Sequence, residues 1–284
     1  MASGTQKESD ERYRVQSVER ALHLVEAIAE CSPDGLTVTE LSRNLKVSKS
    51  TAYALAQTLV SNGFLRELYP GPRYQLGLSL LRLGDLVARQ IPLGDTYRPI
   101  LLKLTERTGL TSRAAISEGG YPIFVERVDG PGTVRFHTLL GHREEPHASA
   151  AGKAILSTLP TEEVMQICKD QGMPRRTRNT ITEISVFLDD LERTRRRGFS
   201  IDDEEDADGV FCIGAPFFDH SGRCLGAISV TGIKVDAPSW KMQELGHVVA
   251  EHAAQLTARF NGTQPPWTGS SPLREDGHSE VEEM

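Results

Sequence analysis

The sequence predicts an α+β protein built from two domains, a small helical domain that ends in a hairpin and a larger domain that mixes strands with helices. The chain has 284 residues, which suits two domains at roughly 100–200 residues each. Apolar residues first recur at helical spacing and later fall in short strand-like runs. Pro92 and Gly94 interrupt the pattern between the two parts. We therefore expect one domain over 14–77, a linker helix over 78–91 and a second domain over 92–260.

The first element is an amphipathic helix that begins near Val18. Residues 1–13 are polar, charged and without periodicity, so we expect them to be disordered. One apolar stripe follows at helical spacing, formed by Val18, Ala21, Leu22, Val25, Ile28 and Ala29. The turn residues Ser32–Gly35 end this helix.

Two short helices follow, and each has a recognisable start. Thr37 and Glu40 form a capping box, in which the hydroxyl and the carboxylate each satisfy a free backbone amide. That helix runs to about Leu45. After a short turn Ser48 caps the next helix, which continues to Asn62–Gly63, where Gly63 is suited to a left-handed end.

A hairpin closes the first domain. Residues 64–69 and 73–76 read as strands around the turn Pro70–Pro72. Three helices and then a hairpin within about 60 residues is the order of a winged helix-turn-helix. Leucines recur over 78–88 and predict the linker helix.

The second domain alternates short strands with helices, which predicts a sheet covered by helices. The expected helices are 95–107, 150–159, 161–168, 184–197 and 237–260, and the expected strands are 114–116, 123–125, 134–136, 199–201, 211–215 and 224–230. Residues 261–284 are polar and acidic, which predicts a disordered tail.

Composition and charge narrow the function classes. The net charge of −7 argues against general coating of nucleic acid, but residues 36–75 carry five basic and two acidic side chains, a local charge of +3. The chain has no apolar run long enough for a membrane span and no secretory signal, so we expect a cytoplasmic protein that does not associate with membranes. The four cysteines match no zinc spacing and are expected to be reduced. We expect no metal and no cofactor.

The second helix of the helix-turn-helix is the expected DNA-reading element. Its first side chains are short, polar or basic, as insertion into the major groove of double-stranded DNA requires. The predicted DNA-binding residues are Thr37, Ser48, Lys49, Ser50, Thr51, Tyr53, Gln57 and Arg73, with Tyr74 as a further contact from the wing. The same Ser-Lys-Ser-Thr pattern also suits an ordinary helix start in a protein-interaction module.

Five motifs in this order resemble the IclR-type bacterial transcription regulators over roughly residues 14–260. They are Ser17–Leu22; Leu36–Ser42 with Ser48–Thr51; Tyr74–Gly77; His147–Leu156; and Gly198–Glu205 followed by Gly209–Pro216 and Ala227–Gly232. One position departs from the family, because Ala54 stands where an Arg is frequent after the tyrosine of the reading helix. This difference bears on the operator sequence and leaves the DNA-binding role intact.

The resemblance implies a GAF-like C-terminal domain that binds a small organic-acid or aromatic effector without catalysis. It implies that the backbone amides of Ala150 and Ala151 hold the acid group, and that Asp202, Cys212, Ser229 and Thr231 line the pocket. An amide pair at a helix start suits a carboxylate. Ser229 and Thr231 alternate on one strand and so face one side together. The family also implies a homodimer or dimer of dimers and control of a catabolic operon, with repression favoured over activation.

Several alternatives stay open from the residues themselves. Cys212 sits in an apolar run and is equally suited to a core position, and Asp202 belongs to a charge run that is typical of solvated surface. His142 and His147 also suit plain loop positions. A hydrolase with Cys212 or Ser229 as nucleophile, a metal site built from Cys212, Asp202 and a histidine, and a sensor that binds a protein partner are the competing interpretations. No HExxH, GxSxG or phosphate-loop motif supports an enzyme.

Overall fold

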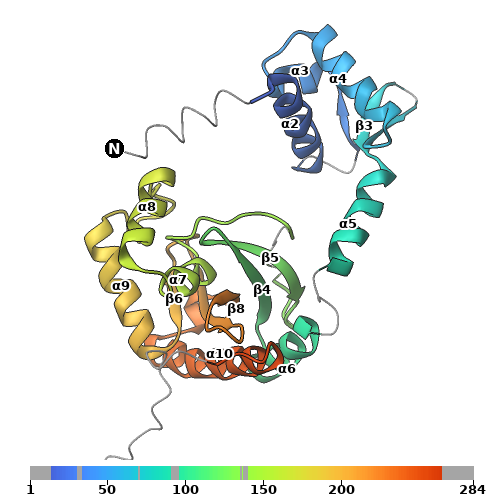
Figure 1. Cartoon of the computed structure of the whole chain (residues 1–284). Coiled ribbons are helices and arrows are strands. Elements are labelled where there is room, and N and C mark those ends of the chain that lie inside the picture. Colours follow the sequence, from blue (N-terminus) through green and yellow to red (C-terminus); the bar gives the residue numbers. More distant parts are fainter. Residues whose placement is uncertain are drawn as a thin grey trace, which may run out of the picture. The chain divides into compact units, whose positions relative to one another are not determined.

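The structure is a computed structural model that describes residues 14–30, 34–69, 71–90, 96–134, 136 and 140–263. The chain divides into two compact units, 1–91 and 92–284, and each is described here by itself (Figure 1). The expectations for residues 1–13, for most of the acidic tail (264–284) and for Cys31 lie outside the described residues.

The N-terminal unit is a winged helix-turn-helix, as predicted. Its elements are α2 (Gln16–Glu30), β1 (Leu36–Thr37), α3 (Val38–Asn44), α4 (Lys49–Ser61), β2 (Leu65–Leu68), β3 (Arg73–Leu76) and α5 (Leu78–Gln90). The strands form an antiparallel sheet in the order β1-β3-β2. The two-residue strand β1 was not anticipated, because its pairing with β3 is set by tertiary contact and leaves no periodic pattern.

Local capping and one compact core hold this unit together. Thr37 and Glu40 form the complete capping box, and Thr51 donates its backbone N–H to the Ser48 hydroxyl at 3.1 Å. Leu24, Leu41, Leu65 and other apolar side chains are buried between the helices and the sheet. The core thus fixes how α4 stands between α3 and the β2–β3 hairpin, which is the wing.

The C-terminal unit contains one five-stranded antiparallel sheet in the order β5-β4-β8-β7-β6. Its elements are α6 (Arg98–Thr108), β4 (Thr111–Glu118), β5 (Tyr121–Val128), α7 (Ala150–Leu156), α8 (Thr161–Gln171), α9 (Ile184–Arg197), β6 (Ser200–Asp203), β7 (Val210–Phe218), β8 (Cys224–Ile233), a short 3-10 turn (Lys234–Asp236) and α10 (Ser239–Arg259). The α+β class is therefore confirmed in this unit as well.

Helices cover both faces of this sheet (Figure 1). On one face Ala151 and Ile155 of α7 pack against Ala115 and Ala227 of the sheet. On the other face α10 and α6 lie against β7 and β4. Because strand residues alternate between faces, β7 and β8 each contribute one set of side chains to the α7 side and the other set to the α10 side.

Three sequence-based boundaries are corrected. Val134 and Phe136 lie outside any strand, so the described part of the predicted strand 134–136 is not one. The helix expected to reach Leu159 ends at Leu156, where the Ser157 and Thr158 hydroxyls each donate to a carbonyl three residues back. The helix expected from Asp95 begins at Arg98. Among the described residues, no helix has the length and apolar character needed to cross a membrane.

Candidate functional site

The start of α4 presents a polar, basic surface. Ser48, Lys49 and Ser50 are exposed, and Tyr53 is 51% exposed one turn further along. The Ser48 hydroxyl lies 2.8 Å from those of Ser50 and Thr51. The three hydroxyls form a hydrogen-bonded cluster at the helix N-terminus, where the macrodipole favours anions such as phosphate.

Further cations precede this helix start in the chain. Arg43 on α3 and Lys46 in the turn are both exposed, as is Lys49. Lys46 has a φ of 52°, the left-handed conformation that reverses the chain between the two helices. Arg43, Lys46 and Lys49 place three positive side chains within seven residues, which suits contact with a DNA backbone.

Four residues that were expected to contact DNA have partners inside the unit. Gln57 donates from Nε2 to the Tyr74 hydroxyl at 3.1 Å, and Thr37 is held in its capping box. Arg73 donates to the backbone carbonyls of Asp34 and Gly35 at 3.0 and 2.7 Å. Tyr74 is fully buried, so the expectation that it touches DNA from the wing is wrong for this structure.

In the C-terminal unit, three of the predicted effector residues lie side by side across the sheet. Asp202 pairs in register with Cys212, and Cys212 pairs with Thr231. All three are nearly completely buried, which corrects the surface interpretation of Asp202. Cys212 Sγ lies 3.3 Å from Thr231 Oγ1. The row therefore forms a continuous polar strip on the face of the sheet that α7 covers.

Ser229 belongs to the neighbouring row on the same face. It pairs with Gly214 on one side and with Arg113 on the other. Its Oγ is buried and has no hydrogen-bond partner among the described residues. An unpaired buried hydroxyl is costly, and one such group in a native structure calls for a specific explanation such as a ligand.

The start of α7 lies directly over this row. The Ala150 carbonyl accepts a hydrogen bond from the Ser200 hydroxyl at 2.6 Å, and a Cβ added at Gly214 would lie 2.7 Å from the same carbonyl oxygen. The Ser149 hydroxyl already accepts from the backbone N–H of Gly152. The predicted residues Ala150 and Ala151 are thus brought to the same face as Cys212, Ser229 and Thr231.

Arg113 joins this cluster and was missed from the sequence. Its side chain is buried on β4, and Nη2 lies 3.4 Å from Cys212 Sγ. Its guanidinium stands over the Phe124 ring at 4.5 Å, and Nη1 lies 3.6 Å from Glu144 Oε1. The signal for it in the sequence is that Arg113 is the single charged residue in the otherwise uncharged run Thr111–Ile116.

Lys153 ties α7 to the edge of the same site. Its buried ammonium lies 2.5 Å from Glu205 Oε1 and 2.8 Å from Asp190 Oδ2, and it also donates to the Ile201 carbonyl. Burial lowers the pKa of Lys153, but the two carboxylates outweigh it and the net direction is upward. The Glu205 backbone N–H in turn donates to Asp202 Oδ1 at 2.7 Å, so the Lys153 network also positions Asp202.

The site favours binding over thiolate chemistry. Burial raises the pKa of Asp202 to about 7, against the lowering effect of the Glu205 amide and of Lys153. Burial, reinforced by Asp202, also raises the pKa of Cys212 far above its usual value. A thiol held protonated is a poor nucleophile. Burial lowers the pKa of His147, which fills a structural position 3.1 Å from the Pro174 carbonyl.

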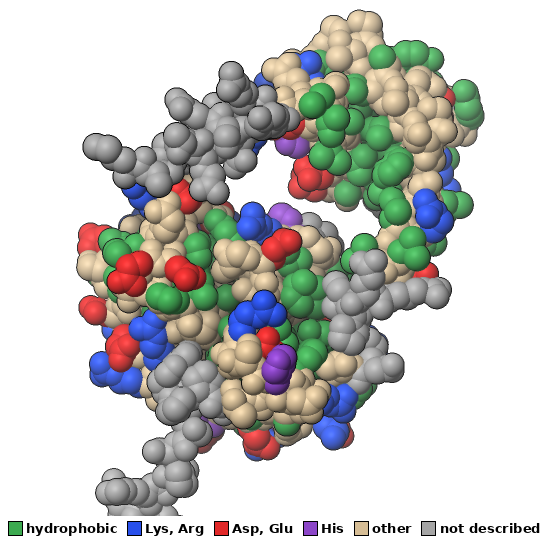
Figure 2. Space-filling view, viewed as in Figure 1, with side chains coloured by type: hydrophobic (Ala, Val, Ile, Leu, Met, Phe, Trp, Pro, Cys, Tyr) green, Lys and Arg blue, Asp and Glu red, His purple; other side chains and the backbone are tan. Residues whose placement is uncertain are grey.

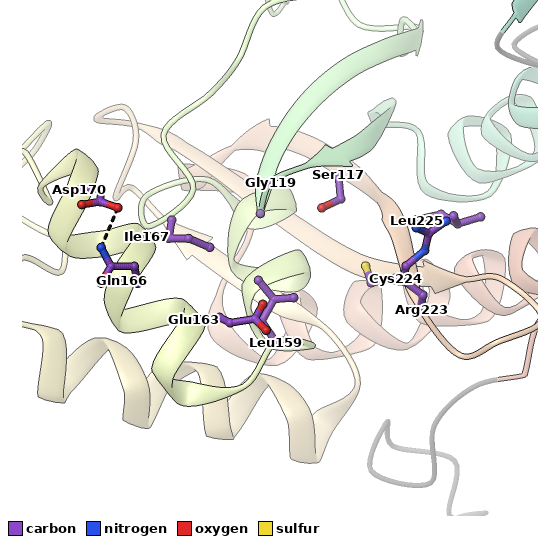
Figure 3. A pocket seen from close by; sticks show the side chains of 11 residues that line it. Ser117, Gly119, Leu159, Glu163, Gln166, Ile167, Asp170, Arg223, Cys224 and Leu225 are labelled. Carbon is purple, nitrogen blue, oxygen red and sulfur yellow. Dashed lines mark hydrogen bonds between the residues drawn. The ribbon is translucent and has the colours of Figure 1, made fainter. Parts of the chain in front are cut away.

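The described residues of this unit line hollows of different sizes. One of about 220 Å³ reaches Thr231 and Thr111 and has apolar walls from Leu110, Val134 and Phe136. Another, about 540 Å³, lies between the β4–β5 turn, α8 and the β7–β8 turn (Figure 3). It contains none of the predicted residues. Among the residues the structure describes, no group of three or more His, Cys, Asp and Glu side chains is arranged to hold a metal ion.

Two family models match the chain. The model of the bacterial transcriptional regulator IclR C-terminal domain matches residues 86–258, and that of the IclR helix-turn-helix domain matches residues 17–68. Together they cover both units and include the start of α4 as well as the cluster around Cys212.

Individual proteins agree with these matches. The acetate operon repressor of Salmonella typhimurium is 31% identical over 253 residues, which cover 88% of this chain and 92% of that protein. The crystal structure of Thermotoga maritima IclR is 27% identical, with a TM-score of 0.71 over 87% of this chain and 99% of its own. An IclR homologue from Microbacterium hydrocarbonoxydans, crystallised with 4-hydroxybenzoate, shares the fold at 18% identity, with a TM-score of 0.70 over 87% and 99% of the two chains.

Proposed function

Because this chain belongs to the IclR family of bacterial transcriptional regulators, we propose that it reads an operator with α4 and senses a small organic or aromatic acid at the Cys212 cluster. It is a DNA-binding transcription regulator with a C-terminal effector-binding domain. We place the DNA-binding domain at 14–77, the linker helix at 78–91 and the effector domain at 92–260. Such a role assigns the protein to the cytoplasm, where the DNA is.

The start of α4 carries the DNA-binding proposal. Lys49 and the Ser48–Ser50–Thr51 hydroxyls are proposed to contact phosphates and base edges, with Tyr53 reaching further into the groove. Thr37, Gln57 and Arg73 are proposed as additional DNA contacts. To reach DNA they would first have to leave their partners inside the unit; otherwise they act indirectly, by holding the wing in place. The exposed Ala54 leaves one position of the helix without a polar contact.

The buried polar row carries the effector proposal. Asp202, Cys212, Ser229 and Thr231 gather buried polar side chains on the sheet face that the Ala150 and Ala151 amides of α7 cover. Ligand pockets have this character, a largely apolar chamber with a few converging polar groups. The 4-hydroxybenzoate found in the Microbacterium homologue makes aromatic acids the first class to test here.

We propose that the protein acts as a homodimer or a dimer of dimers. Val18 and Leu22 on α2 and Leu78 and Leu81 on α5 are each more than half exposed, and Figure 2 shows hydrophobic side chains gathered on this unit. Exposed apolar patches of this kind mark association surfaces. Helix-turn-helix dimers bind two half-sites, so pairing here sets the half-site spacing. Sedimentation analysis of Leu81→Lys tests whether this surface forms the dimer contact. A variant that associates like the wild type would exclude the surface as the dimer contact.

We propose repression of a catabolic operon as the output, relieved by the effector. A ligand shifts operator affinity only if it binds the DNA-bound and free states differently. The test is a footprint on the DNA upstream of the protein's own gene, repeated with benzoate and 4-hydroxybenzoate. Protection that neither acid changes would contradict effector control by this class, and no protection at all would contradict operator binding there.

The competing function is an enzyme with Cys212 or Ser229 as nucleophile. The upward shift of the Cys212 pKa weighs against a thiolate. Ser229 Oγ has no base within hydrogen-bond reach among the described residues. We therefore propose binding without catalysis. Rapid labelling of Cys212 by a thiol reagent at neutral pH would favour the enzyme instead.

A further inference from the structure

We propose that Arg113 binds the carboxylate of the effector, and that Glu144 is the placeholder that this carboxylate replaces. The inference rests on the proposed acid effector and names the residue that recognises its charge. It assigns a role to Arg113, a buried arginine of the predicted pocket row.

The position of the guanidinium follows from strand register. Arg113 on β4 pairs with Ser229 on β8, and Cys212 stands on the next strand, β7. Because Nη2 of Arg113 lies 3.4 Å from Cys212 Sγ, the side chain crosses over β8 to reach β7. The guanidinium therefore lies over the middle of the predicted pocket.

The orientation suits a carboxylate. The Phe124 ring supports the guanidinium at 4.5 Å from its centre, a contact that stabilises the cation and limits its rotation. An arginine fixed in this way offers parallel N–H groups that match the two oxygens of a carboxylate. A lysine ammonium does not offer two parallel N–H groups, so carboxylate binding here depends on the shape of the guanidinium as well as on its charge.

Glu144 is a weak partner for a buried arginine. Its Oε1 stands 3.6 Å from Nη1, beyond ordinary hydrogen-bond distance. Burial raises the pKa of Glu144, and the nearby Arg113 only partly offsets this effect. The segment that carries Glu144 is held to β5 by its own backbone, since the Glu144 N–H donates to the Pro122 carbonyl. A turn of the Glu144 side chain away from Arg113 would leave that backbone anchor in place.

Ser229 supplies an independent pointer to a ligand. Its Oγ is fully buried, lacks a partner among the described residues and stands in register with Arg113. A carboxylate held by the guanidinium would accept the Ser229 O–H as well. A hollow of about 220 Å³ reaches the neighbouring pair Thr111 and Thr231, two residues along the same strands, and we assign the remainder of a benzoate-sized acid to it.

The test is calorimetric titration of the full chain with benzoate, 4-hydroxybenzoate and the neutral 4-hydroxybenzamide. We expect the acids to bind and the amide to bind at least 10-fold more weakly, and Arg113→Met to weaken the acids by about 10- to 100-fold while leaving the amide unchanged. Arg113→Lys should restore only part of the loss. Glu163→Gln in the second hollow (Figure 3) is the control and should bind all three as the wild type does.

Glu144→Gln gives a second, independent readout because it removes the competing carboxylate but keeps its shape. We expect severalfold tighter binding of both acids and no change for the amide. Equal acid binding by wild type and Arg113→Met, or weaker binding by Glu144→Gln, would overturn the role of Arg113 while the acid-effector proposal stands. A wild type that binds neither acid would overturn both the role of Arg113 and the proposal of an aromatic acid as effector. If Arg113→Met does not fold, the amide comparison and Glu144→Gln decide.

Discussion

The side-chain amide of Gln57 on α4 donates to the hydroxyl of Tyr74 on β3 at 3.1 Å, and so joins α4 to the wing. The same Nε2 lies 3.3 Å from Glu67 on β2. One polar side chain from α4 thus contacts both strands of the hairpin, which fixes the wing relative to α4.

This relationship separates two roles for Gln57. If Gln57 holds the wing, Gln57→Ala and Tyr74→Phe should each lower the unfolding free energy by about 0.5–1.5 kcal/mol. Both variants should then also weaken operator binding, and to a similar extent as each other. If Gln57 reads a base, Tyr74→Phe should leave operator affinity unchanged. Urea unfolding together with gel-shift titration measures both quantities.

Lys49 should contribute a phosphate contact. Lys49→Ala is expected to weaken binding to the operator and to unrelated DNA alike, and to reduce the slope of log K against log salt by about 1. Lys103→Ala, an exposed lysine in the C-terminal unit, is the control and should leave the slope unchanged. A slope that Lys49→Ala leaves intact would exclude the contact.

The Lys153 network should be the most sensitive electrostatic element of the C-terminal unit. Lys153→Met leaves Asp190 and Glu205 as buried carboxylates without their cation, and we expect a loss of about 3–5 kcal/mol in unfolding free energy. Arg107→Ala breaks the half-exposed pair with Glu251 and should cost no more than about 1 kcal/mol. Similar losses in the two variants, by urea unfolding, would contradict this ranking.

Asp202 should make stability depend on pH in the acidic range. Its folded pKa of about 7 lies above the unfolded value near 4, so between these values the folded state binds more protons than the unfolded state. Stability from this group therefore falls as pH rises from about 4 to 7, by at most about 1.4 kcal/mol per unit, and is constant above 7.

The matching variant is Asp202→Asn, which keeps an oxygen to accept from the Glu205 and Asp206 amides. We expect its advantage in unfolding free energy over the wild type to be larger at pH 8 than at pH 5. Urea unfolding at both values measures the difference, and an equal advantage at the two pH values would show that Asp202 does not titrate in this window.

Local chemistry explains why much of the first unit could be predicted from the sequence. The Thr37–Glu40 capping box and the Ser48 cap depend only on neighbours within three residues, and both are present in the structure. The left-handed Gly63 at the end of α4 was predicted for the same reason. The orientation of side chains in the folded unit could not be predicted in this way. Tyr74 and Gln57 turn inward because the helix packs against the hairpin, and this contact joins residues that are distant in the sequence.

The Cys212 cluster also depends on contacts between residues that are distant in the sequence. The family resemblance implies Cys212, Ser229 and Thr231, and their grouping depends on strand register that no local pattern encodes. Arg113 escaped notice because a charged residue in a strand usually faces solvent. Only the pairing of β4 with β8 brings it beside Cys212. The described part of the predicted strand 134–136 is not a strand, because a short run with Val134 and Phe136 expresses a local preference and provides no pairing partner.

The alternation along β7 and β8 has a consequence for how sensors of this kind can be altered. Cys212 and Thr231 face one side of the sheet, while their neighbours Ile213 and Val230 are fully buried on the other. The residues that would choose a ligand and those that hold the domain together are therefore different residues on the same strands. An engineer could change the ligand preference by exchanging one set of side chains while the packing beneath it keeps its composition.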